Sequence, residues 1–348
     1  MLAASVKTEI PLRFLLLAAA LCLATSGALA DEVRLANGDR ISGTIKGKSG
    51  KKLLVATAHA GEVAVDWAQV VAVTTTRPVE ILLKGAAAPV KGTLQPLYGG
   101  SALLVGVDGA ATEIALSDIA HLNPQPHETG TGITYAGRTT LSAAYTGGNV
   151  ESERLYADAE LTARALRYRY AISGRVEQRE DPALGDNSAW LAAANYDRFF
   201  AGRHFGYGRA SLERDEAKDL DQRSALGLGY GVDLLDSPVA RLSVRGGPEY
   251  VVVERFAGPH EEYPAAGWGI KGSWLPGAGR LELFHEQDGF WNLEDTDVVT
   301  LRSKTGLRVP VMARLDATAQ INMDWESEPA PGRASTDRTL LLGLDYTW

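Results

Sequence analysis

The feature that most constrains this chain is the strict alternation of apolar and polar residues over 137–348. In the stretch 314–325, one face would carry Leu, Ala, Ala, Ile, Met and Trp, whereas the other would carry Arg, Asp, Thr, Gln, Asn and Asp. A period of two is the side-chain repeat of a β-strand, and it turns one face toward an apolar medium. The pattern therefore predicts an all-β region. A soluble sandwich alternates too, so the pattern leaves open which face meets water.

The alternating stretches number twelve, and an even count is typical of bacterial outer-membrane barrels. We expect antiparallel strands at 137–147, 150–163, 166–179, 187–200, 203–216, 221–234, 239–253, 262–274, 279–291, 296–310, 313–325 and 336–348.

The connections between these strands alternate in length. Those after even-numbered strands are short, whereas most of those after odd-numbered strands are longer and more acidic, at 180–186, 215–221, 256–262, 292–297 and 326–337. Short periplasmic turns and long outer loops are typical of an outer-membrane barrel. The last strand alternates through Leu344, Tyr346 and Trp348, an ending that resembles the signal read by the barrel-assembly machinery. We therefore expect a transmembrane barrel, with that machinery and outer-membrane lipid as partners.

An export signal precedes this region. The first thirty residues combine a basic start, an apolar run at 14–23 and the small residues Ala28 and Ala30, so we expect cleavage before Asp31. The apolar run is too short to span a membrane as a helix. The residue before Cys22 is a leucine, which argues against a lipoprotein signal.

Composition narrows the possible functions. The formal net charge is −8, which argues against nucleic acid as a partner. The only cysteine lies in the leader, so the mature chain would have no disulfide and no thiol nucleophile. No later segment reaches 18 consecutive apolar residues. A closed barrel is the remaining way for such a chain to cross a membrane.

A weak internal repeat lies before the barrel region. The stretches 33–73 and 79–122 align loosely, and each contains four or five short strand-like runs separated by turn residues. Two small SH3-like or Sm-like barrels in tandem fit this pattern, and a single sandwich of about six to ten strands is the alternative. We expect four parts, listed in order as a signal peptide at 1–30, a periplasmic repeat domain at 31–123, a linker at 124–136 and the barrel at 137–348.

Several short motifs resemble a known family. They are Gly132, the segment Thr146-Gly147-Gly148-Asn149, the segment Asp197-Arg198-Phe199-Phe200 and the glycine-rich 227–231. Their order and spacing over 130–348 resemble the domain of unknown function 481, whose members are often labelled salt-induced outer-membrane proteins. The stretch 35–43 resembles the periplasmic leader of many members. This family has no established catalytic residues, so the resemblance implies none here.

If apolar side chains face lipid, charged side chains line the lumen. The residues expected to point inward are Arg169, Arg175, Glu177, Arg179, Arg209, Glu213, Arg241, Arg245, Glu249, Glu282, Glu286, Arg302, Lys304 and Arg308. One hypothesis is a narrow polar passage. The other is that opposite charges on neighbouring strands pair across the lumen and fill it, for example Arg302, Lys304 and Arg308 with Glu282 and Glu286. Twelve strands lie well below the 16–18 of open porins. We favour a filled or very narrow lumen.

A catalytic role is not expected. His285 and Ser303 fall on the predicted lipid face, nearly opposite each other near an aromatic belt with Phe290 and Trp291. A remote alternative is a lipid hydrolase that uses this pair, but a nucleophile and base need an orienting third group, and none is evident. The six histidines show no HxxxH or HxH spacing, so neither a metal site nor a cofactor is expected.

These observations predict an outer-membrane protein of a Gram-negative bacterium, with the N-terminal domain and the C-terminus in the periplasm. Its role would be passive, such as restricted passage, envelope integrity or salt response. In the alternative, the barrel anchors the repeats at 31–122, which bind a peptide, peptidoglycan or another envelope partner.

Overall fold

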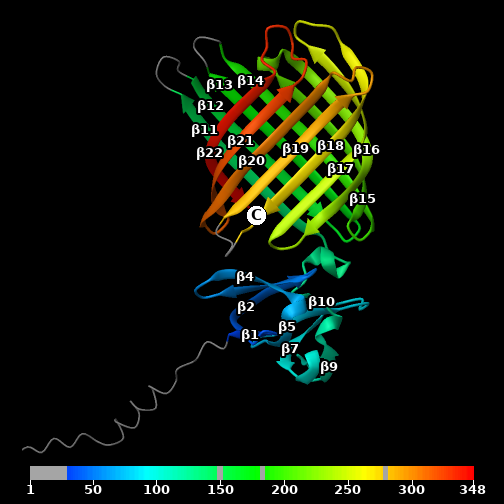
Figure 1. Ribbon diagram of the computed structural model, residues 1–348, viewed down its shortest axis with the longest axis vertical. Coiled ribbons are helices and arrows are strands. Elements are labelled where there is room, and N and C mark those ends of the chain that lie inside the picture. Colours follow the sequence, from blue (N-terminus) through cyan, green and yellow to red (C-terminus); the bar gives the residue numbers. More distant parts are fainter. Residues whose placement is uncertain (1–29, 147–151, 181–184, 277–280) are drawn as a thin grey trace, which may run out of the picture.

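The computed structural model describes residues 30–146, 152–180, 185–276 and 281–348, and it consists of a large barrel with a smaller sheet domain beyond one end (Figure 1). The predicted leader with Ala28 and most of the Thr146–Asn149 motif lie outside these ranges. Within the described ranges, no helix is both long and apolar enough to cross a membrane.

Twelve antiparallel strands close the barrel, which confirms the predicted number. Their bounds are β11 Thr134–Thr146, β12 Ser152–Arg164, β13 Tyr168–Glu180, β14 Asn187–Ala201, β15 His204–Asp215, β16 Leu220–Asp236, β17 Ala240–Arg255, β18 Glu261–Trp274, β19 Glu282–Asn292, β20 Val299–Met312, β21 Leu315–Glu326 and β22 Thr336–Thr347. The largest offsets from the predicted bounds are three residues, as at β11, which starts at 134 instead of 137.

The first and last strands close the ring. β11 and β22 pair antiparallel from Arg138–Thr347 to Ala143–Leu342. The main chain of Trp348 exchanges two hydrogen bonds of 3.1 Å with Gly137, and the indole lies over this glycine, where a Cβ would collide with it. The predicted assembly signal, Leu344, Tyr346 and Trp348, lies on the outer face of this seam, about half exposed.

The outer face of the barrel is apolar. Large side chains that would be buried in a soluble protein are open to the surroundings, such as Ile172 at 62%, Leu228 at 66% and Leu342 at 62% exposed. Exposed aromatic residues gather toward the strand ends, a distribution typical of outer-membrane barrels. Those toward the short turns are Tyr135, Tyr170, Tyr196, Phe200, Tyr230, Trp274, Tyr346 and Trp348, and those toward the long loops are Tyr250, Phe256 and Trp291. The barrel is thus an outer-membrane-type β-barrel.

The N-terminal domain contains ten short strands. They are β1 Asp31–Leu35, β2 Arg40–Ser49, β3 Lys52–Thr57, β4 Gly61–Asp66, β5 Val70–Thr74, β6 Val79–Leu83, β7 Val90–Pro96, β8 Ser101–Gly106, β9 Ala111–Ala115 and β10 Ile119–Leu122. The first five pair in the order β5-β1-β2-β3-β4, and the next five repeat it as β10-β6-β7-β8-β9. Both orders are that of an SH3-like barrel, so the internal repeat corresponds to two copies of one topology.

The two copies are fused rather than separate. Leu122 on β10 pairs with Lys48 on β2, which joins both copies into one ten-stranded sheet. One cluster of buried apolar side chains draws on both copies, including Val33 and Leu53 from the first and Ile81 and Leu94 from the second. The domain therefore combines the two arrangements considered from sequence: SH3-like repeats sharing a single core.

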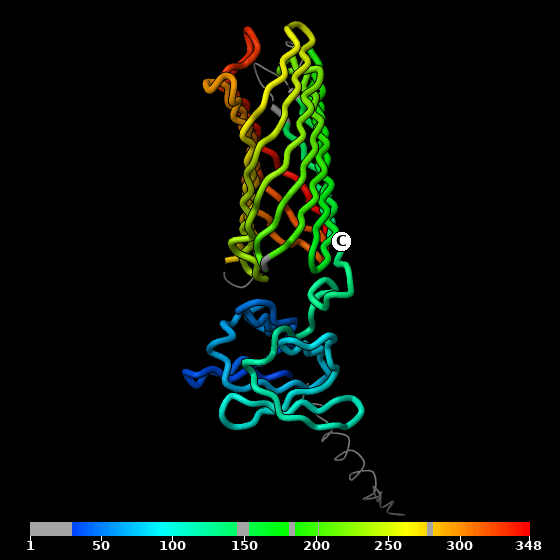
Figure 2. The backbone as a smooth tube through the Cα atoms, turned by 90° about the vertical axis from the view of Figure 1, so that its right-hand side faces the viewer, coloured from blue at the N-terminus to red at the C-terminus, as the bar shows by residue number. Residues whose placement is uncertain are grey.

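The domain lies beyond the barrel end that carries the short turns (Figures 1 and 2). A short 3₁₀ turn, η4 Pro126–Thr129, connects the two parts. Within it, the Glu128 carboxylate accepts hydrogen bonds from the Ser49 hydroxyl at 2.5 Å and the Gln125 N–H at 2.8 Å, and lies 3.3 Å from His121 Nδ1. Burial alone would raise the pKa of Glu128, but these hydrogen bonds outweigh it and lower the pKa to about 2. The linker is thereby fastened to the domain.

Candidate functional site

The barrel interior collects the charged side chains. Along β13, burial alternates from Arg169 onward, with Arg169, Arg175 and Glu177 on the inner face and Ile172 and Val176 on the outer one. The alternation arises because successive side chains of a strand point to opposite faces. The same alternation places most of the charges predicted to face inward on the lumen wall.

Ion pairs cross the lumen between strands that are not neighbours. Lys271 on β18 binds Glu160 on β12, and these strands stand on opposite sides of the ring, with five strands between them in either direction. Lys304 on β20 donates to Asp158 on β12 at 2.9 Å, and Lys304 and Lys271 both lie 3.6 Å from Glu286 on β19. These contacts bridge the interior from wall to wall.

A second group of charges centres on Glu213 of β15, toward the long-loop end. Its carboxylate accepts hydrogen bonds from Arg302 on β20 at 2.5 Å and Arg223 on β16 at 3.3 Å, and lies 3.7 Å from Arg175 on β13. Arg223 also donates to Glu326 at 2.6 Å. The side chain of Glu213 is only 2% exposed, so three arginines from three walls enclose it.

A third group lies on β14, β15, β17 and β19. Arg209 and Arg245 each donate to Asp288 at 2.9 Å, and Arg245 also donates to Asn195 at 2.7 Å. Glu249 lies 4.0 Å from Arg209, and both side chains are almost fully buried. The group therefore joins four strands of the wall through side chains alone.

The short-turn end holds two further groups. Arg308 binds Asp345 and donates to Glu282 at 3.4 Å, and Arg138 donates to the same Glu282 oxygen at 3.4 Å. In the second group, Arg169 donates to Asp197 at 2.6 Å and to Asp233 at 3.4 Å.

Three of the predicted lumen residues lie toward the rims. Glu177 pairs with Arg154 at 3.1 Å near the long-loop end, and Arg179 lines a pocket there together with Lys218. The pocket has a volume of about 40 Å³, which is room for only a few water molecules. Arg241 is exposed near the start of β17, at the short-turn end.

Aromatic side chains fill space between the charges, which sequence reasoning missed. Phe205, Tyr207 and Phe290 are at most 6% exposed on the inner face, and the Arg209 and Arg302 guanidinium groups lie 5.8 and 5.7 Å from the Phe290 ring. Phe290 was expected in an outer aromatic belt, and this was wrong because its position shares the inward face with Glu286 and Asp288. Counting alternation from Glu282 would have placed it correctly.

The glycine-rich stretch of β16 provides room for these side chains. A Cβ at Gly227 would collide with Glu249, and one at Gly231 would collide with the Phe205 ring. Gly229 is likewise closed in by the main chain of Gly246 and by Tyr207. These glycines therefore allow a dense interior, in line with their expected role in close packing.

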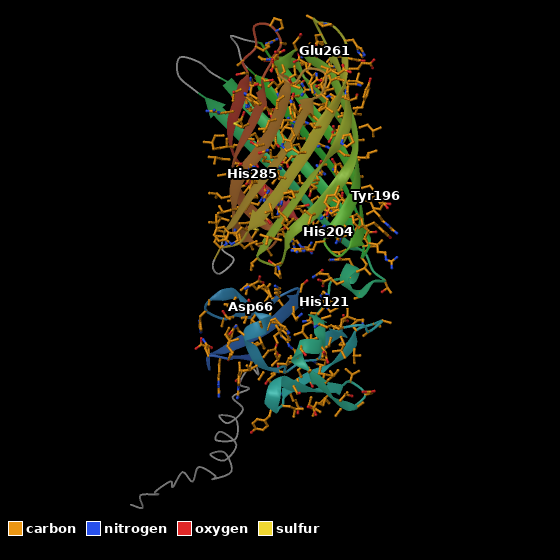
Figure 3. All side chains as sticks on the ribbon, turned by 45° about the vertical axis from the view of Figure 1, so that its right-hand side comes forward. Asp66, His121, Tyr196, His204, Glu261 and His285 are labelled. Atoms are coloured by element: carbon orange, nitrogen blue, oxygen red, sulfur yellow. The ribbon has the colours of Figure 1, made fainter. Side chains whose placement is uncertain are left out.

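The pairing required by the hydrolase alternative is not present. His285 is half-buried on the outer wall (Figure 3), but its cross-strand partner is Thr305, whose hydroxyl lies 2.7 Å from His285 Nδ1. Ser303 stands opposite Gln287 instead. The expectation that His285 and Ser303 lie nearly opposite was wrong, because the register of the β19–β20 hairpin is offset by two residues. Among the described residues, no group of three or more His, Cys, Asp or Glu side chains is arranged to hold a metal ion.

Comparison with known proteins gives one relative and several structures. The chain is 25% identical over 210 residues to the uncharacterized protein YdiY of Escherichia coli (strain K12). The aligned region covers 60% of this chain and 81% of YdiY. A NanC porin structure aligns with 60% of this chain and 98% of the porin chain, with 9% identity and a TM-score of 0.39. The translocator domain of the autotransporter NalP from Neisseria meningitidis aligns with 62% of this chain and 88% of the NalP chain, with 15% identity and a TM-score of 0.35.

The family comparison covers the barrel. The model of the family described as "Protein of unknown function, DUF481" matches residues 139–348, which run from β11 to the last residue. This range is more than half of the chain and contains three of the motifs that suggested the resemblance from sequence, at 146–149, 197–200 and 227–231, whereas Gly132 lies before it. The protein therefore belongs to the DUF481 family.

Proposed function

We propose that this protein is a closed outer-membrane barrel that anchors the tandem SH3-like domain at the periplasmic face, and that its role is not catalytic. The observation that carries the proposal is the Lys271–Glu160 pair, which spans the lumen between opposite walls. Together with the arginines around Glu213, it places charge-paired side chains across the path that a solute would take. Such a lumen supports anchoring over passage.

The proposed orientation has the short turns, the N-terminal domain and the C-terminus in the periplasm of a Gram-negative bacterium. Short turns face the periplasm in barrels of this type. The sheet domain lies at that end, and Trp348 hydrogen-bonds with Gly137 in the first barrel strand (Figure 1). An exported chain with this architecture would present its repeats to the cell wall.

The anchored domain would bind an extended segment of a periplasmic partner. Its sheet path ends at β4 on one side and β9 on the other, and among the described strands neither has a second neighbour. An unpaired strand edge offers main-chain donors and acceptors to an added strand. These edges favour a peptide partner over peptidoglycan, which has no extended polypeptide strand to add to the sheet.

Conductance in planar bilayers tests the closed-anchor proposal. The full-length protein, with insertion verified by heat-modifiable mobility, is expected to give no discrete channel steps. A double variant, Lys271→Ala with Glu160→Ala, removes the bridge without leaving a lone charge, and it should conduct or leak more than the wild type. Discrete steps from the wild type would overturn the anchor and favour restricted passage.

A further inference from the structure

The outer wall of the barrel carries an apolar groove whose floor has almost no side chains. On β15, the lipid-facing positions between His204 and Leu212 are Gly206, Gly208 and Ala210. The groove extends over β13 to β17 with a volume of about 850 Å³. Gly208 and Ala210 line the groove, and Gly206 is the next lipid-facing position toward the short turns.

Larger side chains form the two banks of the groove. Tyr196 on β14 and Leu228 on β16 stand opposite Gly208, one on each side. In the next row, Ala210 lies between Ala194 and Leu226. The groove therefore covers two rows of side chains and runs across the strands from β13 to β17, open to the lipid beside the barrel wall.

The short-turn end of the groove is cationic. Arg198 stands beside Gly206 and is exposed on the outer face of β14, between Tyr196 and Phe200. Arg203 and Arg167 are exposed in the adjoining short turns. Among the residues that the structure describes, none of these three guanidinium groups has a carboxylate within ion-pair distance, although most arginines inside the barrel do.

A polar aromatic pair marks the same level of the wall. His204 Nδ1 is hydrogen-bonded to the Tyr230 hydroxyl, and the two rings stack with centroids 5.9 Å apart. Phe200 adds a ring 6.2 Å from Tyr230 and is 65% exposed. Figure 3 shows Tyr196 and His204 on the barrel wall toward the short-turn end. Rings with one apolar and one polar end sit where lipid tails meet headgroups.

We propose that this groove binds an anionic glycerophospholipid of the leaflet at the short-turn end. An acyl chain would lie in the groove over Gly208 and Ala210, and the phosphate would meet Arg198, one row nearer the short turns, with Arg203 and Arg167 on either side. Arginine donates two parallel hydrogen bonds to a phosphate, which gives it preference for this group. The uncompensated positive charge at the groove end selects an anionic headgroup over a zwitterionic one. The site is independent of whether the lumen conducts.

Lipid retention by the full-length protein tests this site. The protein is reconstituted into nanodiscs of equal phosphatidylglycerol and phosphatidylcholine, and the lipids that stay bound after release are identified by native mass spectrometry. The wild type should retain phosphatidylglycerol preferentially. Arg198→Gln should lower this preference about tenfold, while bound phosphatidylcholine remains. Arg314→Gln, an exposed arginine in the β20–β21 turn, should leave the preference unchanged.

A second experiment fills the groove with a larger side chain and measures lipid retention in the same way. A Cβ at Gly208 meets no atom within 4 Å, so the main chain leaves room for a side chain to start there. Gly208→Leu should fill the floor, and both lipids should be lost. Gly174→Leu is the matched control, because Gly174 is also exposed on the outer face and a Cβ there meets only Leu191 O at 3.8 Å. Equal retention by these two variants, or a wild type with no preference, would overturn the proposal. Cross-linking of two chains through Gly208→Cys in membranes would also overturn it, since a second copy would then cover the groove.

Discussion

The barrel and the N-terminal domain use strands of the same two-residue period but are turned inside out relative to each other. In the domain, Val33, Leu53 and Ile81 are fully buried in an apolar core. In the barrel, one of the most deeply buried large side chains is Arg308, whereas Leu342 is 62% exposed. The difference shows that alternation defines two faces of a strand, while the surrounding medium decides which face is covered.

The largest effect is expected for a charge inside the barrel. Glu213→Gln leaves Arg302 and Arg223 without their shared carboxylate, and breaking a buried ion pair costs about 3–5 kcal/mol of unfolding free energy. Urea titration of the full chain in lipid vesicles, followed by tryptophan fluorescence, measures it. Glu254→Gln, whose side chain is 51% exposed at the long-loop end, is the control and should change little. Equal behaviour of the two variants would mean that the interior is hydrated like the surface.

Removal of an apolar side chain should matter most in the domain. Leu53→Ala creates a cavity in the shared core and is expected to cost about 2–5 kcal/mol. Leu342→Ala removes the same atoms from a lipid-facing position and should cost less, because lipid can fill the space. Hydrogen exchange of the β3 and β22 amides in the full chain compares the two sites. A larger effect at Leu342 would contradict the inside-out arrangement.

Replacing an exposed apolar side chain with a charged one should cost more unfolding free energy in the barrel than in the domain. Leu342→Arg places a cation in the lipid-facing band, which costs about 2–4 kcal/mol near the bilayer midplane. Val90→Arg, at a position 46% exposed on the domain surface, should stay within about 0.5 kcal/mol. The urea concentrations at the unfolding midpoints of the two variants measure this difference. Tolerance of arginine at Leu342 would mean that this face meets water.

The smallest effect concerns the linker between the two regions. Because the folded pKa of Glu128 is about 2 and the ordinary value is 4.5, its contribution is present above pH 4.5 and is lost as the pH falls toward 2. At pH 7, Glu128→Gln should weaken the fastening of the linker by about 1.5–3 kcal/mol, the range of hydrogen bonds to a charged group. Limited proteolysis of the linker between pH 7 and 3 reports the fastening. Wild-type cleavage that does not rise with acid would contradict the role given to Glu128.

Much of the fold follows from local patterns. The strand bounds, the even count and the long acidic loops are properties of neighbouring residues in sequence, and hairpin pairing depends on little else. The inward positions of Glu213 and Arg302 followed from the alternation of side chains along their strands alone. The position of Phe290 was predicted wrongly, because an aromatic residue beside Trp291 resembles a residue of the outer aromatic belt. Counting the alternation along the whole strand places Phe290 on the inner face.

The pairing inside the barrel could not be derived in this way. From sequence, Arg302, Lys304 and Arg308 were matched with Glu282 and Glu286 on the neighbouring strand. Arg308 does meet Glu282 and Lys304 does meet Glu286, but the short contact of Arg302 is with Glu213, five strands away around the ring. Asp345 and Asp288, which pair with four arginines between them, were absent from the predicted set.

By itself, the sequence determined that the chain has twelve alternating strands with an apolar and a polar face, preceded by a repeated β-domain, because these are periodic properties of adjacent residues. Only the tertiary structure decided which charges meet and where the wall is hollow. Closure of the ring sets β12 opposite β18 and brings Lys271 to Glu160. The groove on the outer wall likewise takes its lining from five strands, β13 to β17. Both features depend on distances across several strands, which no local pattern encodes.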